Sequence, residues 1–199
     1  MADFTETAAE AVDPGRIVRL EAQDGTVCEL PANAAALSGL VRNMLDPEDA
    51  DDDSEDEDAS IIPLPNVSSA ALEQVAAFCR HHVEDVMDPI ERPIKNTDIR
   101  QCTKEWYADF TETLWEDPGL FFEVMMAANY MEVVPLLDLT CCYFTGRIKR
   151  LSPEEIEETY GVQMTETEKR QVREEYEATK RHEKWGENGA PNGAPADKA

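Results

Sequence analysis

The longest apolar run in the chain spans residues 119–148, and its pattern predicts two helices in tandem. Pro135 suits the first turn of the second helix, where a missing backbone N–H costs nothing. Four polar positions divide the run, so a membrane span is not expected: Glu123, Asn129, Glu132 and Asp138. The first helix has two apolar stripes, whereas a surface helix needs only one. It is therefore either a central core helix or a core helix whose other side contacts a partner.

Alternating residues near the N-terminus predict a β-hairpin. Val18, Leu20 and Ala22 would share one face of a strand at residues 17–23, and Asp24-Gly25 is a turn signal before a second strand at 26–30. A hairpin alone is marginally stable, so this one must pack on other elements. Residues 32–45 predict a single helix with these residues on one side: Leu37, Leu40, Val41, Met44 and Leu45.

The middle of the chain predicts two helices separated by a linker. Two prolines confine residues 61–65 to a sheet edge or a parallel strand end. Ser68 is a candidate cap for a helix reaching about His82, with these side chains inward: Leu72, Val75, Phe78 and Cys79. Residues 83–102 have no sustained period and contain prolines, which is typical of a linker. Thr103 is a candidate cap for a helix bearing Trp106, Phe110 and Leu114.

Two capping boxes mark the C-terminal helices. Ser152-Pro-Glu-Glu predicts one helix with Gly161 as its stop, and Thr165-Glu-Thr-Glu predicts another reaching about residue 185. The last helix is polar nearly all round, with Val172, Tyr176 and Trp185 as its sizeable apolar residues. A helix that buries so little is expected to be loosely docked unless a partner completes it.

Strands at the front and apolar helices late in the chain predict an α+β fold, with a small sheet flanked by helices. The helices after about residue 117 carry more apolar surface than the number of their neighbours within the chain accounts for. This excess favours a partner-binding surface.

Composition narrows the classes of partner. The formal net charge of −25 and a pI near 4.3 disfavour nucleic acid and anionic membranes, since both would repel the chain. Much of this charge lies in residues 46–58, which predict a solvated loop or a contact for a basic partner. Ser54 in this loop is a candidate phosphorylation site because acidic residues follow it. Residues 1–16 and 186–199 predict disordered tails.

No motif predicts catalysis, a metal site or a cofactor. The sequence contains no phosphate-binding glycine loop, no Gly-x-Ser-x-Gly and no paired Cys-x-x-Cys. Cys79, His81 and His82 lack the spacing of a zinc finger. The five cysteines and the absence of a basic n-region followed by an apolar run predict an intracellular, reduced protein.

Six segments in register resemble one known family. They are Ile-Ile-Pro-Leu-Pro-Asn-Val at 61–67, Phe-Cys-Arg-His-His at 78–82, Ala-Ala-Asn-Tyr at 127–130, Leu-Leu-Asp-Leu-Thr-Cys at 136–141, Ser-Pro-Glu-Glu-Ile at 152–156 and Thr-Glu-Lys-Arg-Gln-Val-Arg at 167–173. The chain from about residue 17 to 176 resembles the S-phase kinase-associated adaptor of Skp–cullin–F-box ubiquitin ligases. The resemblance implies a BTB/POZ fold at 17–150, with disordered loops near 46–60 and 83–102, and a two-helix F-box-binding extension at 151–185.

The resemblance also implies a function and two binding surfaces. Family members are non-catalytic adaptors that bridge a cullin to interchangeable F-box proteins, which select substrates for ubiquitination. By position, the cullin-facing residues would be Met125, Asn129 and Tyr130. The F-box-facing residues would be Phe122, Leu137, Cys141, Phe144, Ile148, Ile156, Tyr160, Val172, Tyr176 and Trp185. The resemblance further implies a location in cytoplasm and nucleus, and a weak homodimer when the protein is free.

The chain departs from the family pattern in its last helix. Family members usually carry a Trp shortly after the Val-Arg of this helix, and here either Tyr176 or Trp185 would replace it. In some protists the proline of the Ser-Pro-Glu-Glu motif is hydroxylated and glycosylated, and Pro153 matches that proline by position. Three other functions remain as alternatives: an elongin-C-like adaptor, a structural assembly subunit such as a kinetochore component, and an acidic chaperone for basic proteins.

Overall fold

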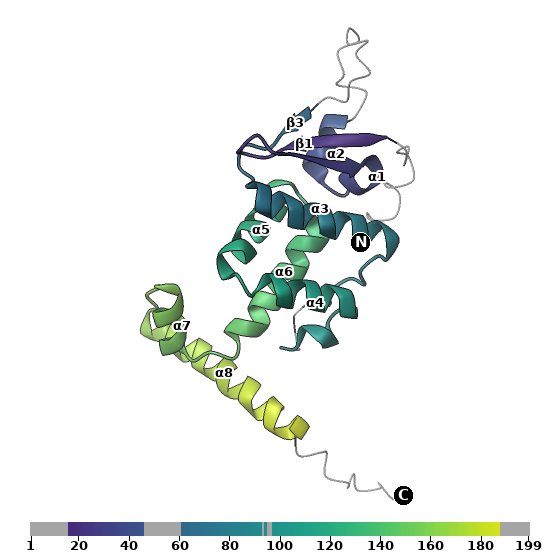
Figure 1. Ribbon diagram of the computed structural model, residues 1–199. Coiled ribbons are helices and arrows are strands. Elements are labelled where there is room, and N and C mark those ends of the chain that lie inside the picture. The colour runs from purple at the N-terminus through teal and green to yellow at the C-terminus, as the bar shows by residue number, and fades with distance from the viewer. Residues whose placement is uncertain (1–15, 46–60, 93, 95–96, 188–199) are drawn as a thin grey trace, which may run out of the picture.

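The computed structural model describes residues 16–45, 61–92, 94 and 97–187, with side chains as far as residue 181 (Figure 1). The predicted tails, the acidic segment at 46–58 and Ser54 lie largely or wholly outside the described residues. A three-stranded sheet lies at one end of the molecule, helices form the middle, and two C-terminal helices extend from the other end (Figure 1). The α+β class predicted from the sequence is confirmed.

The sheet has the order β2-β1-β3, with β1 at Ile17–Glu21, β2 at Val27–Pro31 and β3 at Ile61–Pro63. β1 and β2 form the predicted hairpin, in which Val18 pairs with Leu30 and Gly25 takes a positive φ of 82°. β3 adds to the edge of β1 in parallel, as its two prolines predict. Val18, Leu20 and Ala22 are all buried, so the hairpin packs its predicted apolar face on the helices.

The single helix predicted at 32–45 is wrong, because the chain forms α1 at Ala32–Ala35 and α2 at Gly39–Leu45. Ser38 separates them: its hydroxyl donates to the Met131 carbonyl oxygen at 2.5 Å and accepts the Val41 N–H at 3.1 Å. Because of this break, the residues predicted to share one apolar side are not all buried. Val41 is fully buried, whereas Met44 is 53% exposed.

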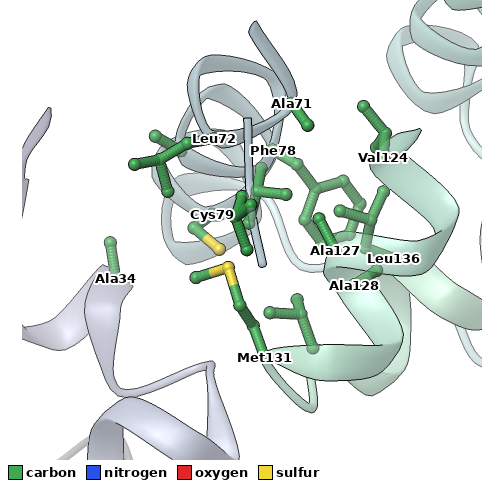
Figure 2. Packing of buried hydrophobic residues seen from close by; sticks show 14 of the residues in the cluster. Ala34, Ala71, Leu72, Phe78, Cys79, Val124, Ala127, Ala128, Met131 and Leu136 are labelled. Carbon is green, nitrogen blue, oxygen red and sulfur yellow. The ribbon is translucent and has the colours of Figure 1, made fainter. Parts of the chain in front are cut away.

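α3 at Ser69–Glu84 is the central helix of the core. The Ser68 hydroxyl accepts the Ala71 N–H at 3.3 Å, which confirms the predicted cap. The four side chains of α3 that were predicted to point inward are all buried. Figure 2 shows Phe78 directed towards Val124 and Ala127 of α5, which spans Pro118–Tyr130. α3 also packs on α1 and β2, so it joins the sheet to the later helices.

The segment after α3 is more ordered than a linker along its described part. Met87 and Ile99 are buried, and Ile99–Gln101 form a 3-10 turn, η1. α4 follows at Glu105–Leu114, but Lys104 and not Thr103 occupies its N-cap position, without a side-chain cap bond. Part of the segment predicted as a disordered loop near 83–102 instead packs on the core, through Met87, Ile90, Ile94, Ile99 and Cys102.

The remaining predictions of helices are confirmed. α5 is followed by α6 at Val134–Ile148, with Pro135 in its first turn. α7 spans Pro153–Tyr160 with both bonds of the Ser152 capping box, and Gly161 ends it with φ 64°. α8 spans Glu166–Glu187, and the Thr165 hydroxyl accepts the Glu168 N–H at 3.4 Å at its start. Within the described residues, no helix has the length and apolarity needed to cross a bilayer.

A buried histidine, His82, is hydrogen-bonded to Tyr107 in this core. The Tyr107 hydroxyl donates to the Asp85 carbonyl oxygen at 2.6 Å, and the His82 Nδ1 atom lies 3.1 Å from the same hydroxyl. The single hydroxyl hydrogen is used by Asp85, so His82 donates its own Nδ1 proton to Tyr107. Burial lowers the pKa of His82 below its ordinary 6.5, with smaller contributions from His81 and Lys104 that exceed the opposing effect of Asp85.

We expect acid to destabilise the protein through His82. Below the ordinary pKa of about 6.5, the unfolded chain binds a proton that the folded chain resists, so stability falls with pH in that range. His82→Phe keeps a planar ring beside Phe78 and removes the titrating group. Urea unfolding of both proteins at about pH 7.5 and 5.5 tests this, because that interval brackets the free histidine pKa. An equal loss of stability in both proteins would contradict the assignment.

Candidate partner-binding surfaces

The outward face of α5 carries residues of both predicted surfaces, the one for an F-box protein and the one for a cullin. Its inward face buries Phe121, Val124 and Ala128, while Asn129 is exposed and Tyr130 is half-buried on the opposite side. Phe122 lies on this outward face near the start of the helix. Seven residues of helical rise separate Phe122 from Asn129, or about 10 Å. The predicted F-box and cullin surfaces therefore lie along one rigid helix.

The C-terminal end of α5 forms an exposed apolar corner with the start of α6. The structure brings the predicted residues Met125, Asn129 and Tyr130 to this corner. Two neighbours that the sequence did not single out are exposed, Met126 at 67% and Val134 at 58%, whereas the predicted Met125 is half-buried. The apolar pattern of α5 runs nearly all round the helix, so it did not show which of two adjacent methionines faces outward.

An aromatic row continues from α5 across α6 to α7. The rings of Phe122 and Phe144 lie 5.2 Å apart, and those of Phe144 and Tyr160 lie 5.5 Å apart, both edge to face. Trp115 supports the row at 6.2 Å from both phenylalanines, and the Arg147 guanidinium lies 5.1 Å from the Trp115 ring centre. The sequence pattern did not single out Trp115, because this residue precedes the apolar run at 119–148 and has no apolar neighbours at helical spacing.

The predicted residues of α6 share one side of that helix. Leu137, Cys141, Phe144 and Ile148 follow one another at intervals of three or four residues. Leu137, Phe144 and Ile148 are half-buried, and Cys141 is exposed. The opposite side is buried in the core through Leu136 and Leu139. α6 therefore presents a largely apolar, partly exposed side from a firmly packed helix.

Two predicted residues of α7 are less accessible than a contact or modification site requires. Ile156 is 7% exposed, and Pro153 is also buried. Both lie on the inner side of the short helix, whose outer side is acidic. Without movement of α7, these residues present little surface to a partner or to a modifying enzyme.

α8 lies beyond the main body and packs on α7 (Figure 1). Lys169 pairs with Glu157 at 2.9 Å, and Arg173 pairs with Glu154. The Met164 N–H and Lys169 together lower the pKa of Glu157, and Glu157 in turn raises the pKa of Lys169. The Arg173–Glu154 pair is exposed and the Lys169–Glu157 pair is partly exposed, and ion pairs at a surface hold a helix weakly.

The apolar side of α8 is only partly covered by the rest of the described chain. Val172 and Tyr176 are half-buried, and the Lys180 ammonium lies 5.6 Å from the Tyr176 ring centre. None of the side chains described in α8 is fully buried, in agreement with the loose docking that the sequence predicts. The backbone of Trp185 belongs to α8, but its side chain lies outside the described residues. Its role relative to Tyr176 stays a prediction.

The chemistry of these surfaces is that of recognition. Among the described residues, no group of three or more His, Cys, Asp or Glu side chains could hold a metal ion. The half-buried rings and methionines can adapt to different apolar side chains of a partner. The sheet and the central helices form a BTB/POZ-type fold, and α7 and α8 are an extension of it.

Comparison with known proteins assigns the family. The Skp1 family tetramerisation domain matches residues 16–84, and the Skp1 family dimerisation domain matches residues 134–179. The chain is 35% identical to the "E3 ubiquitin ligase complex SCF subunit sconC" of Arthroderma otae, over 80% of this chain and 92% of that protein. It is 30% identical to the "S-phase kinase-associated protein 1 homolog" of Tetrahymena thermophila, over 85% of this chain and 93% of that protein. The chain belongs to the Skp1 family.

Proposed function

We propose that this chain is the adaptor subunit of a cullin-based SCF-type ubiquitin ligase, in which it bridges a cullin to F-box proteins. The relative in Arthroderma otae is named as a subunit of such a complex. The observation that carries the proposal is the aromatic row of Phe122, Phe144 and Tyr160, which is half-buried and continuous across three helices. The adaptor itself performs no catalysis and needs no cofactor.

The adaptor acts by fixing geometry. α5 carries Phe122 at one end and Asn129 and Tyr130 at the other, so both partners would contact one rigid helix. This arrangement holds a substrate receptor at a set distance from the scaffold and raises the effective concentration of substrate near the ubiquitin-loading enzyme. The proposed location is the cytoplasm and nucleus, where such substrates would be met.

A pull-down of the tagged full chain from its native cell extract tests the proposal. Recovery of a cullin together with several F-box proteins at moderate salt, identified by mass spectrometry, is expected. Apolar contacts withstand added salt, whereas contacts made through acidic residues weaken. Recovery of basic proteins alone, removed by salt, would overturn the adaptor function and support an acidic chaperone.

Asn129→Lys combined with Tyr130→Lys is expected to abolish cullin binding and leave F-box binding unchanged. Two ammonium groups at the apolar corner would have to lose their hydration on binding, at a cost that no partner charge offsets. Gln23→Lys combined with Val27→Lys is the matched control, because it adds the same two charges at exposed positions of the hairpin. Loss of both partners in a folded double variant would show that the two surfaces are wrongly assigned.

A further inference from the structure

Ile94 and residues 97–102 lie along α6, which spans Val134–Ile148. The Lys149 ammonium donates to the Ile94 carbonyl oxygen at 3.0 Å, and Arg150 donates to the Thr97 hydroxyl at 3.4 Å. A Cβ added at Gly146 would lie only 2.6 Å from the Thr97 carbonyl oxygen. Backbone and helix are therefore in direct contact at this point, and η1 continues the contact with α6.

This path brings two cysteines together. Cys102 directly follows η1, and Cys142 lies about one helical turn before Gly146. The Cys102 side chain is a hydrogen-bonding neighbour of the Cys142 thiol. Cys142 is 2% exposed, whereas Cys102 is half-buried and its thiol also lies 3.5 Å from the Asp98 carbonyl oxygen.

We propose that Cys102 and Cys142 form a reversible disulfide when the protein meets a peroxide, which covalently joins the segment before α4 to α6. The inference rests on the packing of η1 and Thr97 against α6, which makes the two cysteines neighbours, and on their unequal exposure. One sulfur can be reached by a small oxidant, and the other is held beside it to complete the bond. It is independent of the adaptor function.

The reaction proceeds in two steps. The Cys102 thiolate attacks one peroxide oxygen, which forms a sulfenic acid and releases hydroxide. The Cys142 sulfur then gives up its proton and attacks the Cys102 sulfur, forming the S–S bond while the second hydroxide leaves. Two thiols are thus oxidised and one peroxide is reduced to two waters. A dithiol reductant reverses the reaction by exchange.

The surroundings of Cys142 determine the rate. Burial, with a smaller contribution from the Cys102 thiol, raises the pKa of Cys142 to about 12. The thiolate is the attacking form, so bond formation is expected to be slow near neutrality and faster as pH rises. The contact with Cys102 favours the intramolecular bond over further oxidation.

The other cysteines supply controls. Cys141 neighbours Cys142 in sequence but is exposed on the outward side of α6. Cys79 is buried in α3, where burial raises the pKa of its thiol to about 12. Cys28 lies in β2, where its sulfur is 3.9 Å from the Arg80 guanidinium. Cys141→Ser therefore removes the most exposed thiol without touching the proposed pair.

The test is peroxide treatment of the full chain, followed by alkylation with N-ethylmaleimide and peptide mass mapping. We expect one cross-linked peptide pair that contains Cys102 and Cys142, and that is lost after dithiothreitol. The pair should persist in Cys141→Ser and be absent from Cys102→Ser. Recovery of Cys102 as a sulfinic acid with Cys142 alkylated would overturn the proposal, as would a bond that joins Cys141.

A second measurement does not depend on peptide recovery. A bond between residues 102 and 142 would restrict the unfolded chain, so peroxide should raise the urea midpoint of unfolding, and dithiothreitol should restore it. Cys141→Ser should show the same rise, and Cys102→Ser should show none. An unchanged midpoint in the oxidised full chain, or an equal rise in Cys102→Ser, would refute the disulfide.

Discussion

Removal of residues 163–199 is expected to weaken binding to an F-box protein by about a hundredfold and to leave the main body folded. The truncation removes Val172 and Tyr176, and loss of two central contact residues commonly costs about 1–2 kcal/mol each, or roughly tenfold per residue. α8 packs on α7 through two ion pairs at the surface, and none of its described side chains is fully buried. Stability of the main body should therefore change little.

Titration calorimetry with an F-box protein recovered in the pull-down measures the affinity, and urea unfolding measures the stability. In the full chain, Val172→Ala combined with Tyr176→Ala should reproduce most of the loss. Gln171→Ala, at an exposed position on another side of the same helix, is the matched control. An affinity that survives the truncation would mean that α8 does not contact the partner.

The elements with strong local signals could be predicted from the sequence. Asp24-Gly25 marked the hairpin, Ser68 and Ser152 marked the starts of α3 and α7, and Pro135 marked the start of α6. In each case the determining contact lies within a few residues, as in the Ser152–Glu155 capping box. Signals within a few residues therefore allowed most of the secondary structure to be predicted.

The division of residues 32–45 could not be predicted, since its cause is distant in sequence. Ser38 donates to the Met131 carbonyl oxygen across 93 positions, and the Gly39 N–H donates to the Glu132 carbonyl oxygen. Glu132 takes a positive φ of 57° at this turn. A tertiary contact at the α5–α6 corner thus overrides the helical pattern of the earlier segment.

The candidate surfaces were predictable only in part. The apolar excess of α5 and α6 indicated that a partner is needed, and the family resemblance assigned residues to each partner. Neither could show that Trp115 supports the aromatic row, since this depends on how the end of α4 packs on α5 and α6. Neither could show that Ile156 is buried, since this depends on how α7 lies against the rest of the chain. Side-chain direction on a helix that is apolar all round is decided by its neighbours.

Phe121→Ala is expected to lower the free energy of unfolding by about 3–5 kcal/mol, because it removes a fully buried ring and leaves a cavity. Phe121 lies 4.9 Å from Trp115 and 5.7 Å from both Phe122 and Tyr143, measured between ring centres. Its loss would also remove the support beneath the aromatic row. Urea unfolding followed by circular dichroism measures the change.

Phe122→Ala is the matched variant, since it deletes the same side chain from the adjacent residue on the outward face. Its ring is half-buried, so less apolar area returns to water on unfolding and a smaller loss of stability is expected. F-box affinity should fall in the folded Phe122→Ala protein, because its ring begins the aromatic row. If Phe122→Ala instead costs as much stability as Phe121→Ala and leaves F-box affinity intact, Phe122 belongs to the core and the partner surface begins at Phe144.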